Sequence, residues 1–186
     1  MAFPQARDPS WVRLATLVTL ATVAVVVARF GLNPQTPAFC YLAAVGVPLA
    51  FIDVREYRLP DVLTLPSYPA CLLLLGVAAP FLPGGTGRFV HALIGMAAAA
   101  ALFFLLLLAF PAGIGMGDVK LAGPLGAYLG WLGATAFVAG LMAAWLLAAV
   151  TGLGLMAAGR ATRKTQLPFG PFLIIGAFLA ILASTF

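Results

Sequence analysis

Two aspartates, Asp53 and Asp118, are the side chains of this sequence best suited to chemistry. The chain of 186 residues has only five acidic residues. Asp53 directly follows the apolar run 47–52, and Asp118 directly precedes the largely apolar segment 119–131. An ionisable group beside a membrane-spanning segment is costly and therefore indicates a functional site. Two carboxyl groups that share one water molecule can hydrolyse an amide when one is ionised and the other protonated.

The expected helix ends predict how these two carboxyl groups divide the work. Asp53 is expected at the C-terminus of one helix and Asp118 at the N-terminus of another. A helix dipole disfavours the negative charge of Asp53 at a C-terminus and favours that of Asp118 at an N-terminus, by about 0.3–1 kcal/mol. We therefore predict that Asp118 is the base and that Asp53 carries the proton.

Glycines precede Asp118 at alternate positions. Pro111 is expected to end the preceding helix, and Gly113, Gly115 and Gly117 leave the backbone without side chains. A neighbouring helix or an extended peptide can approach such a backbone closely. Because a peptide bond inside a helix is shielded from attack, a site that cleaves peptides must hold its substrate unwound. The glycine-rich bend is a candidate place to hold it.

Three further charged residues lie near the two aspartates in the sequence. Asp61 follows Pro60 and precedes an apolar run, which is typical of a helix N-cap. Glu56 is expected to pair with a nearby arginine. Lys120 either contributes to membrane topology or stabilises the site, and the sequence leaves both alternatives open.

The composition predicts the elements that must position these residues. With 63% hydrophobic residues, 8% charged residues and a mean hydropathy of +1.11, a soluble globular domain is excluded. We therefore predict an all-α fold, a polytopic transmembrane helix bundle of six or seven spans. At about 20 apolar residues per span, the expected spans are residues 11–29, 37–52, 62–82, 89–110, 119–131, 134–158 and 170–186. Residues 1–186 are expected to form a single membrane-embedded domain, with 1–36 as a retained N-terminal anchor.

The basic residues predict the orientation in the membrane. With a cytoplasmic N-terminus, alternating spans leave only Arg29 and Arg88 outside. The basic residues then inside are Arg7, Arg13, Arg55, Arg58, Lys120, Arg160, Arg163 and Lys164. An excess of Lys and Arg on the cytoplasmic side is the usual pattern of such proteins. This orientation puts Asp53 and Asp118 at the cytoplasmic edge of the membrane.

Other features are interpreted as structural. The net charge of +5 is not gathered into a basic patch with interleaved aromatic residues, so no nucleic acid partner is expected. Cys40 and Cys71 lack metal-ligand spacing and are expected to be small buried residues, and no metal or other cofactor is expected. Gly126 and Gly130 predict a seam of close helix packing. Trp131 is expected at the membrane interface.

The pattern around the two aspartates resembles the GxGD aspartyl peptidases and, within that group, the type IV prepilin peptidases. Three segments carry the resemblance. Residues 51–66 contain an Asp followed by a Leu-Pro-Asp turn, residues 115–131 begin with Gly-Met-Gly-Asp, and residues 166–172 read Gln-Leu-Pro-Phe-Gly-Pro-Phe. They occur in the order of that family and make residues from about 40 to 186 the expected catalytic core.

The resemblance implies an activity and a partner. Asp53 and Asp118 would be the catalytic pair, and the substrate would be a type IV pilin-like precursor. Such a precursor has a short basic leader, a glycine before the cut and a hydrophobic helix after it, and it would be cleaved at the cytoplasmic face of the inner membrane. Glu56 is an alternative contact for the basic leader. The residues expected to shape the site are Pro60, Asp61, Gly115, Gly117, Lys120, Pro168, Gly170 and Pro171.

One departure and two alternatives accompany the resemblance. Many relatives carry an N-terminal region with paired CxxC motifs associated with N-methylation; nothing here corresponds to it, so methyltransferase activity is not expected. A small proton- or ion-coupled membrane transporter is the main alternative, because acids in a bundle of interrupted helices also suit ion coordination. An assembly protein without chemistry is the other. Membrane lipid is an expected partner, and the oligomeric state, including a homo-oligomer, is left open.

Overall fold

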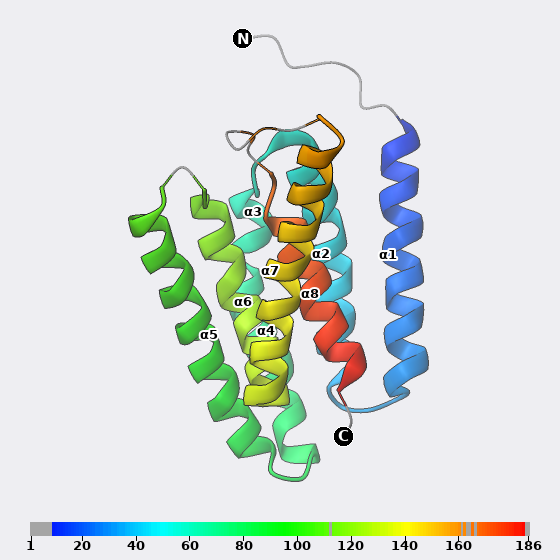
Figure 1. Cartoon of the computed structure of the whole chain (residues 1–186). Helices are drawn as coiled ribbons and strands as arrows, with labels where there is room; N and C mark the ends of the chain where they lie inside the picture. Colours follow the sequence, from blue (N-terminus) through cyan, green and yellow to red (C-terminus); the bar gives the residue numbers. More distant parts are fainter. Residues whose placement is uncertain (1–8, 112, 161, 163–164, 166, 185–186) are drawn as a thin grey trace.

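The structure, a computed structural model, describes residues 9–111, 113–160, 162, 165 and 167–184, and all of its regular elements in these ranges are helical (Figure 1). Five helical stretches are long and apolar enough to cross a membrane, and a sixth apolar helix is shorter. The predicted multi-pass helix bundle is therefore confirmed. The elements are α1 (Pro9–Phe30), α2 (Thr36–Glu56), α3 (Asp61–Thr64), α4 (Ser67–Ala78), the 3₁₀ turn η1 (Ala79–Phe81), α5 (Gly85–Ala109), α6 (Met116–Leu132), α7 (Ala134–Ala157) and α8 (Gly170–Ala183).

The expected span 62–82 is not one regular helix. The chain forms α3, α4 and η1 in succession, and Pro66 stands at the N-cap of α4. A proline has no backbone N–H to donate, so the helical ladder cannot pass through Pro66 unbroken. Taken together, α3, α4 and η1 still cover a stretch that is long and apolar enough to cross the membrane.

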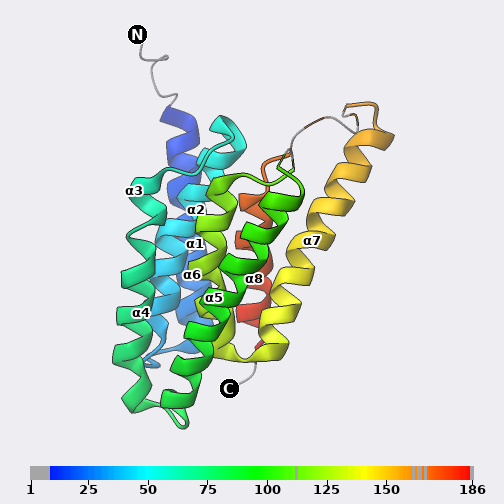
Figure 2. The same cartoon turned by 90° about the vertical axis from the view of Figure 1, so that its left-hand side faces the viewer.

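Helix α6 is the centre of the bundle. Nearly all of its side chains after Asp118 are buried, with Lys120 as the main exception. It lies beside α5 in both views (Figures 1 and 2). A Cβ atom on Gly126 would overlap the carbonyl oxygen of Gly95, and one on Gly130 would overlap the carbonyl oxygen of His91. The predicted packing seam is confirmed, because only glycine lets the two backbones approach this closely.

The seam gives a first testable prediction. Gly126→Ala is expected to lower the free energy of unfolding by about 1–3 kcal/mol, because the added methyl group forces two packed backbones apart. The thermal midpoint of the protein purified in detergent measures this change. Gly154→Ala on α7 is the matched control, since nothing lies within 4 Å of a Cβ atom there. A Gly126→Ala midpoint at or above that of Gly154→Ala would contradict the packing interpretation.

Helix α1 stands at the edge of the bundle beside α2 (Figure 1). An arginine side chain connects each of its two ends to a neighbouring helix. At the start, the guanidinium of Arg55 lies 5.0 Å from the ring centroid of Trp11. At the end, the Arg29 guanidinium donates to the carbonyl oxygens of Leu182 at 3.3 Å and Ser184 at 2.7 Å, which belong to the C-terminal end of α8.

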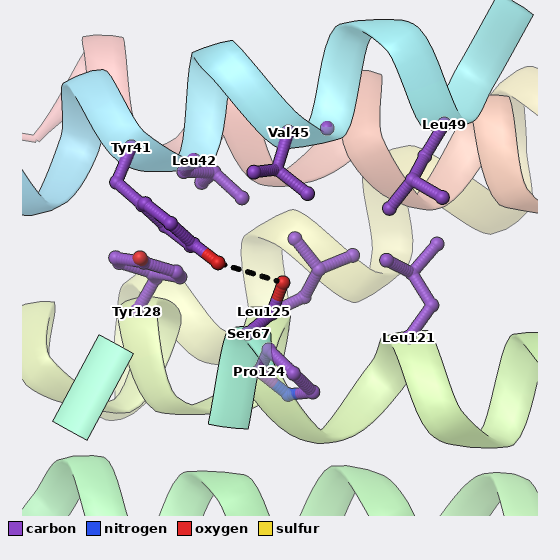
Figure 3. Close-up of a pocket in the computed structure, with 10 residues that line it drawn as sticks. Tyr41, Leu42, Val45, Leu49, Ser67, Leu121, Pro124, Leu125 and Tyr128 are labelled. Carbon is purple, nitrogen blue, oxygen red and sulfur yellow. Dashed lines mark hydrogen bonds between the residues drawn. The ribbon is translucent and has the colours of Figure 1, made fainter. Parts of the chain in front are cut away.

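The interior contains a few polar contacts. The Trp131 side chain is buried and its indole N–H donates to Gln35 Oε1 at 2.7 Å, so the expectation of an interfacial Trp131 is wrong. The reason is that Gln35, at the start of α2, supplies inside the bundle the partner that a membrane interface would otherwise supply. Elsewhere, the Tyr41 and Ser67 hydroxyls lie 3.4 Å apart beside a cavity of about 20 Å³ between α2, α4 and α6 (Figure 3). That cavity is lined mainly by apolar side chains and contains neither aspartate.

The helix directions bring four ends together. The C-terminal ends of α2 and α7 and the N-terminal ends of α6 and α8 lie at the same end of the bundle (Figures 1 and 2). Helix α7 leans away from the other helices toward this end, as Figure 2 shows. The site described next occupies the space that these ends surround.

Candidate active site

Asp53 lies in the last turn of α2 with 5% of its surface exposed. The helix ends three residues later, at Glu56, because Tyr57 adopts a left-handed conformation with φ of 52° and donates its N–H to the Asp53 carbonyl oxygen. The Asp53 carboxylate reaches across to α8, where Oδ2 accepts the backbone N–H of Gly170 at 3.1 Å. Asp53 is thus held by the first residue of a helix that follows it by more than one hundred positions in the sequence.

Asp118 lies in the first turn of α6 with 8% of its surface exposed. Its Oδ2 accepts the backbone N–H of Gly115, the N-cap residue, at 3.0 Å. This contact satisfies one of the backbone donors that a helix start leaves free. Capping of α6 by Asp118 is compatible with a role in chemistry, because the Gly115 N–H binds only one of the two carboxylate oxygens, Oδ2.

Both aspartates line one cavity of about 750 Å³. They are close enough to interact electrostatically. The backbones of Gly113 and Gly115 form part of the lining, as the glycine-rich bend predicted. Two carboxyl groups that face one water-accessible space can bind and activate a single water molecule between them.

The structure changes the argument about which aspartate carries the proton. From the sequence, Asp53 belonged only to the C-terminal end of its own helix. Its carboxylate is in fact held at the N-terminus of α8, where the helix dipole favours negative charge. Asp118 also lies at a helix N-terminus, and Asp53 remains in the last turn of α2, so the difference that the sequence suggested between the two carboxyl groups is reduced.

The residues expected to shape the site differ in how they contribute to it. Gly115, Pro168 and Gly170 contact the cavity or a carboxylate directly. Pro171 lies in the first turn of α8, where a missing N–H costs nothing, and it helps that helix to start beside Asp53. Gly117 instead is not among the residues that line the cavity and packs against Leu59.

Asp61 and Lys120 form an ion pair, with Lys120 Nζ 2.7 Å from Asp61 Oδ1. The expectation that Asp61 caps a helix is wrong: Pro60 is the N-cap of α3, no side-chain capping bond is present, and Asp61 is the first residue of that helix. The preceding proline already sets the backbone for the helix start, which leaves the carboxylate free to reach α6. Glu56 pairs with Arg58 at 3.0 Å on the exposed surface, as expected.

Three aromatic residues that were not among those expected to shape the site form one wall beside the aspartates. Trp145 from α7 and Phe169 before α8 line the cavity, and their ring centroids are 4.8 Å apart. Phe103 from α5 packs behind both, 6.3 Å from Trp145 and 5.8 Å from Phe169. No spacing in the sequence marks Phe103 or Trp145, because each lies in an apolar segment where an aromatic residue is ordinary, whereas Phe169 lies in the segment 166–172 that carries the resemblance. Only the closing of three helices around the cavity brings them together.

Some residues for which the sequence led to expectations lie outside the described residues. They are Arg7, Arg163, Lys164 and Gln166. Of the basic residues that the structure describes, Arg13, Arg55, Arg58, Lys120 and Arg160 are at the aspartate end of the bundle, and Arg29 and Arg88 are at the other. No cluster of three or more His, Cys, Asp or Glu side chains that could hold a metal ion occurs within the described part of the chain.

Known proteins are similar to this chain over most of its length. A family model described as the type IV leader peptidase family matches residues 39–185. A prepilin leader peptidase/N-methyltransferase of Aeromonas hydrophila is 35% identical over 182 residues, which cover 95% of this chain and 58% of the relative. The protein of the same name from Burkholderia pseudomallei (strain 1026b) is 36% identical over 169 residues, 88% of this chain and 52% of the relative. The protein of the same name from Pseudomonas aeruginosa is 32% identical over 177 residues, which cover 89% of this chain and 57% of the relative.

The chain thus spans little more than half the length of these curated relatives. The two activities in their shared name are those of the longer proteins. No solved structure matches the chain significantly.

Proposed function

Because this chain belongs to the type IV leader peptidase family, we propose that it is an intramembrane aspartyl endopeptidase that removes the leader from type IV pilin-like precursors. The observation that carries the proposal is the pair of buried carboxyl groups, Asp53 and Asp118, on one cavity at the end of a membrane bundle. A transport site is expected near the bilayer midplane, whereas both of these residues belong to terminal turns of their helices.

The proposed chemistry uses one water molecule and both carboxyl groups. The ionised carboxyl group takes a proton from the water as its oxygen attacks the carbonyl carbon of the scissile bond. The protonated carboxyl group donates a hydrogen bond to the carbonyl oxygen and stabilises the charge that develops there. Collapse of the tetrahedral intermediate breaks the C–N bond, and the leaving amine takes up a proton from the pair.

The cavity suits an unwound peptide better than a helix. A volume of about 750 Å³ admits a few residues of extended chain beside the aspartates. The Gly113 and Gly115 backbones on its lining can approach an extended strand closely, and the Trp145 and Phe169 rings provide an apolar surface. We propose that the hydrophobic helix of the precursor stays in the lipid while the segment to be cut unwinds into this cavity.

The same proposal includes an orientation. The excess of basic residues at the aspartate end supports an N-terminus and a site at the cytoplasmic face of the inner membrane. A precursor with a basic leader would then present its scissile bond on the side of the membrane where it is made.

The proposal is tested with the purified full chain in lipid vesicles and a pilin-like precursor. We expect one cut, after the glycine that ends the leader, identified by the masses of the two products. Excess EDTA is expected to leave the rate unchanged within about twofold, because a carboxyl pair needs no metal ion to activate water. A folded protein that does not cut the precursor contradicts the peptidase proposal, and cleavage that EDTA abolishes contradicts the aspartyl mechanism.

A further inference from the structure

Leu59 lies between the beginnings of the two helices that hold the catalytic carboxyl groups. It belongs to the short segment between α2 and α3, and only 8% of its surface is exposed. Segments that join helices are usually on the surface, so a buried leucine at this place requires an explanation. It is not among the residues that line the cavity, so contact with the substrate does not explain it.

Leu59 lies against two glycines, Gly117 and Gly170, each of which is beside one of the two aspartates in space. A Cβ atom on Gly117, the residue before Asp118, would lie 3.3 Å from Leu59 Cδ1. A Cβ atom on Gly170, whose N–H holds Asp53, would lie 3.4 Å from the same Leu59 atom. One methyl group therefore fills the space between the first turn of α6 and the first residue of α8.

The segment that carries Leu59 is itself held on both sides. Before it, the left-handed Tyr57 ends α2 and turns the chain sharply. After it, Pro60 restricts the backbone of Leu59 to extended conformations. Asp61 then binds Lys120 of α6 at 2.7 Å. The left-handed Tyr57 and the proline at position 60 thus limit the conformations of the segment that carries Leu59.

We propose that Leu59 is a positioning residue, which sets the spacing of Asp53 and Asp118 by keeping the N-terminal ends of α6 and α8 apart. The expected effect of Leu59 on cleavage rests on the proposed peptidase function, whereas the position of Leu59 between α6 and α8 does not. It also gives Gly117 a role: the glycine makes room for the leucine, whereas Gly113 and Gly115 face the substrate space.

The first test separates positioning from stability by steady-state kinetics of precursor cleavage. Leu59→Ala is expected to lower kcat by about 10–100-fold with KM changed by less than about twofold, because small misplacement of catalytic groups is costly. Leu59→Met, of similar volume, is expected to restore kcat to within about threefold of the wild type. Leu59→Val lacks the Cδ1 atom but keeps most of the burial, and it replaces Leu59→Ala if that variant does not fold.

Leu141→Ala on α7 is the matched control, because Leu141 is similarly buried, with 6% of its surface exposed, and is not on the cavity. It is expected to lower the thermal midpoint about as much as Leu59→Ala while kcat stays within about twofold of the wild type. An unchanged kcat in Leu59→Ala, or an equal fall in Leu141→Ala, overturns the proposal.

A second readout does not need cleavage. In a background of Cys40→Ser and Cys71→Ala, the variant Asp53→Cys with Asp118→Cys is treated with a short bifunctional thiol reagent. Mass spectrometry distinguishes one bridging reagent from two separate adducts. The bridged fraction is expected to change severalfold when Leu59→Ala is added, because the ends of α6 and α8 are then no longer held at their spacing. An unchanged fraction overturns the proposal even if the wild-type protein proves not to be a peptidase, so the two failures are distinguishable.

Discussion

Asp53→Asn and Asp118→Asn are each expected to abolish cleavage of a pilin-like precursor, with kcat lowered by about 10³-fold or more. Asparagine has nearly the shape of aspartate, and its amide oxygen can still accept the N–H of Gly170 or Gly115. It can neither take a proton from water nor deliver one to the substrate. Both variants should therefore fold, and the loss should be chemical. Steady-state assays at saturating precursor measure it.

Asp61→Asn provides the matched control for the same change of side chain. Asp61 is an exposed partner of Lys120 and does not line the cavity. An exposed ion pair contributes little, about 0–1 kcal/mol, so cleavage should remain within a few-fold of the wild type. The double variant of Asp53 and Asp118 should be no slower than either single variant, because the two groups act as a unit. Cleavage by either single variant at the wild-type rate would remove the carboxyl pair from the mechanism.

Gly170→Ala is expected to lower kcat by about 10²-fold although it adds only one methyl group. The new Cβ atom would lie 2.7 Å from Asp53 Oδ2 and 3.3 Å from Asp53 Cγ. The carboxylate must move, and it then loses the backbone N–H that holds it toward the cavity. Because α8 begins at this residue, alanine is otherwise well suited to the position. Precursor cleavage and the thermal midpoint, measured on the same preparation, separate the two effects.

Gly87→Ala is the control for this second substitution. Gly87 lies in the first turn of α5, is exposed, and has nothing within 4 Å of the added methyl group. It should leave kcat unchanged. If Gly170→Ala cleaves as fast as Gly87→Ala, then the hydrogen bond from α8 does not position Asp53, and its carboxylate reaches the substrate in some other way.

The bundle and its two aspartates could be predicted because each depends on local properties of the chain. Spanning helices follow from runs of about 20 apolar residues, and acids at the ends of such runs are rare enough to stand out. The packing seam at Gly126 and Gly130 was predictable for the same reason, since four-residue spacing puts both on one helix face. The interruption at Pro66 was also visible in the sequence, but hydropathy alone merged it into one span.

Contacts between distant segments could not be predicted in this way. The interior position of Trp131 depends on Gln35, which lies 96 residues away. The ion pair between Lys120 and Asp61 joins α3 to α6 and replaces the capping role that local sequence suggested for Asp61. The aromatic wall beside the cavity combines residues from three separate segments, none of which is unusual alone.

By itself, the sequence determined a helical membrane protein with two candidate catalytic carboxyl groups, because hydrophobicity, charge and backbone restriction act over a few residues. Only the tertiary structure decided how those groups are held. It placed the carboxylate of Asp53 at the N-terminus of α8 and thereby reduced the difference in dipole environment that the sequence had suggested. It also inserted Leu59 between α6 and α8. Both arrangements depend on how helices far apart in the chain pack against one another, which no local pattern encodes.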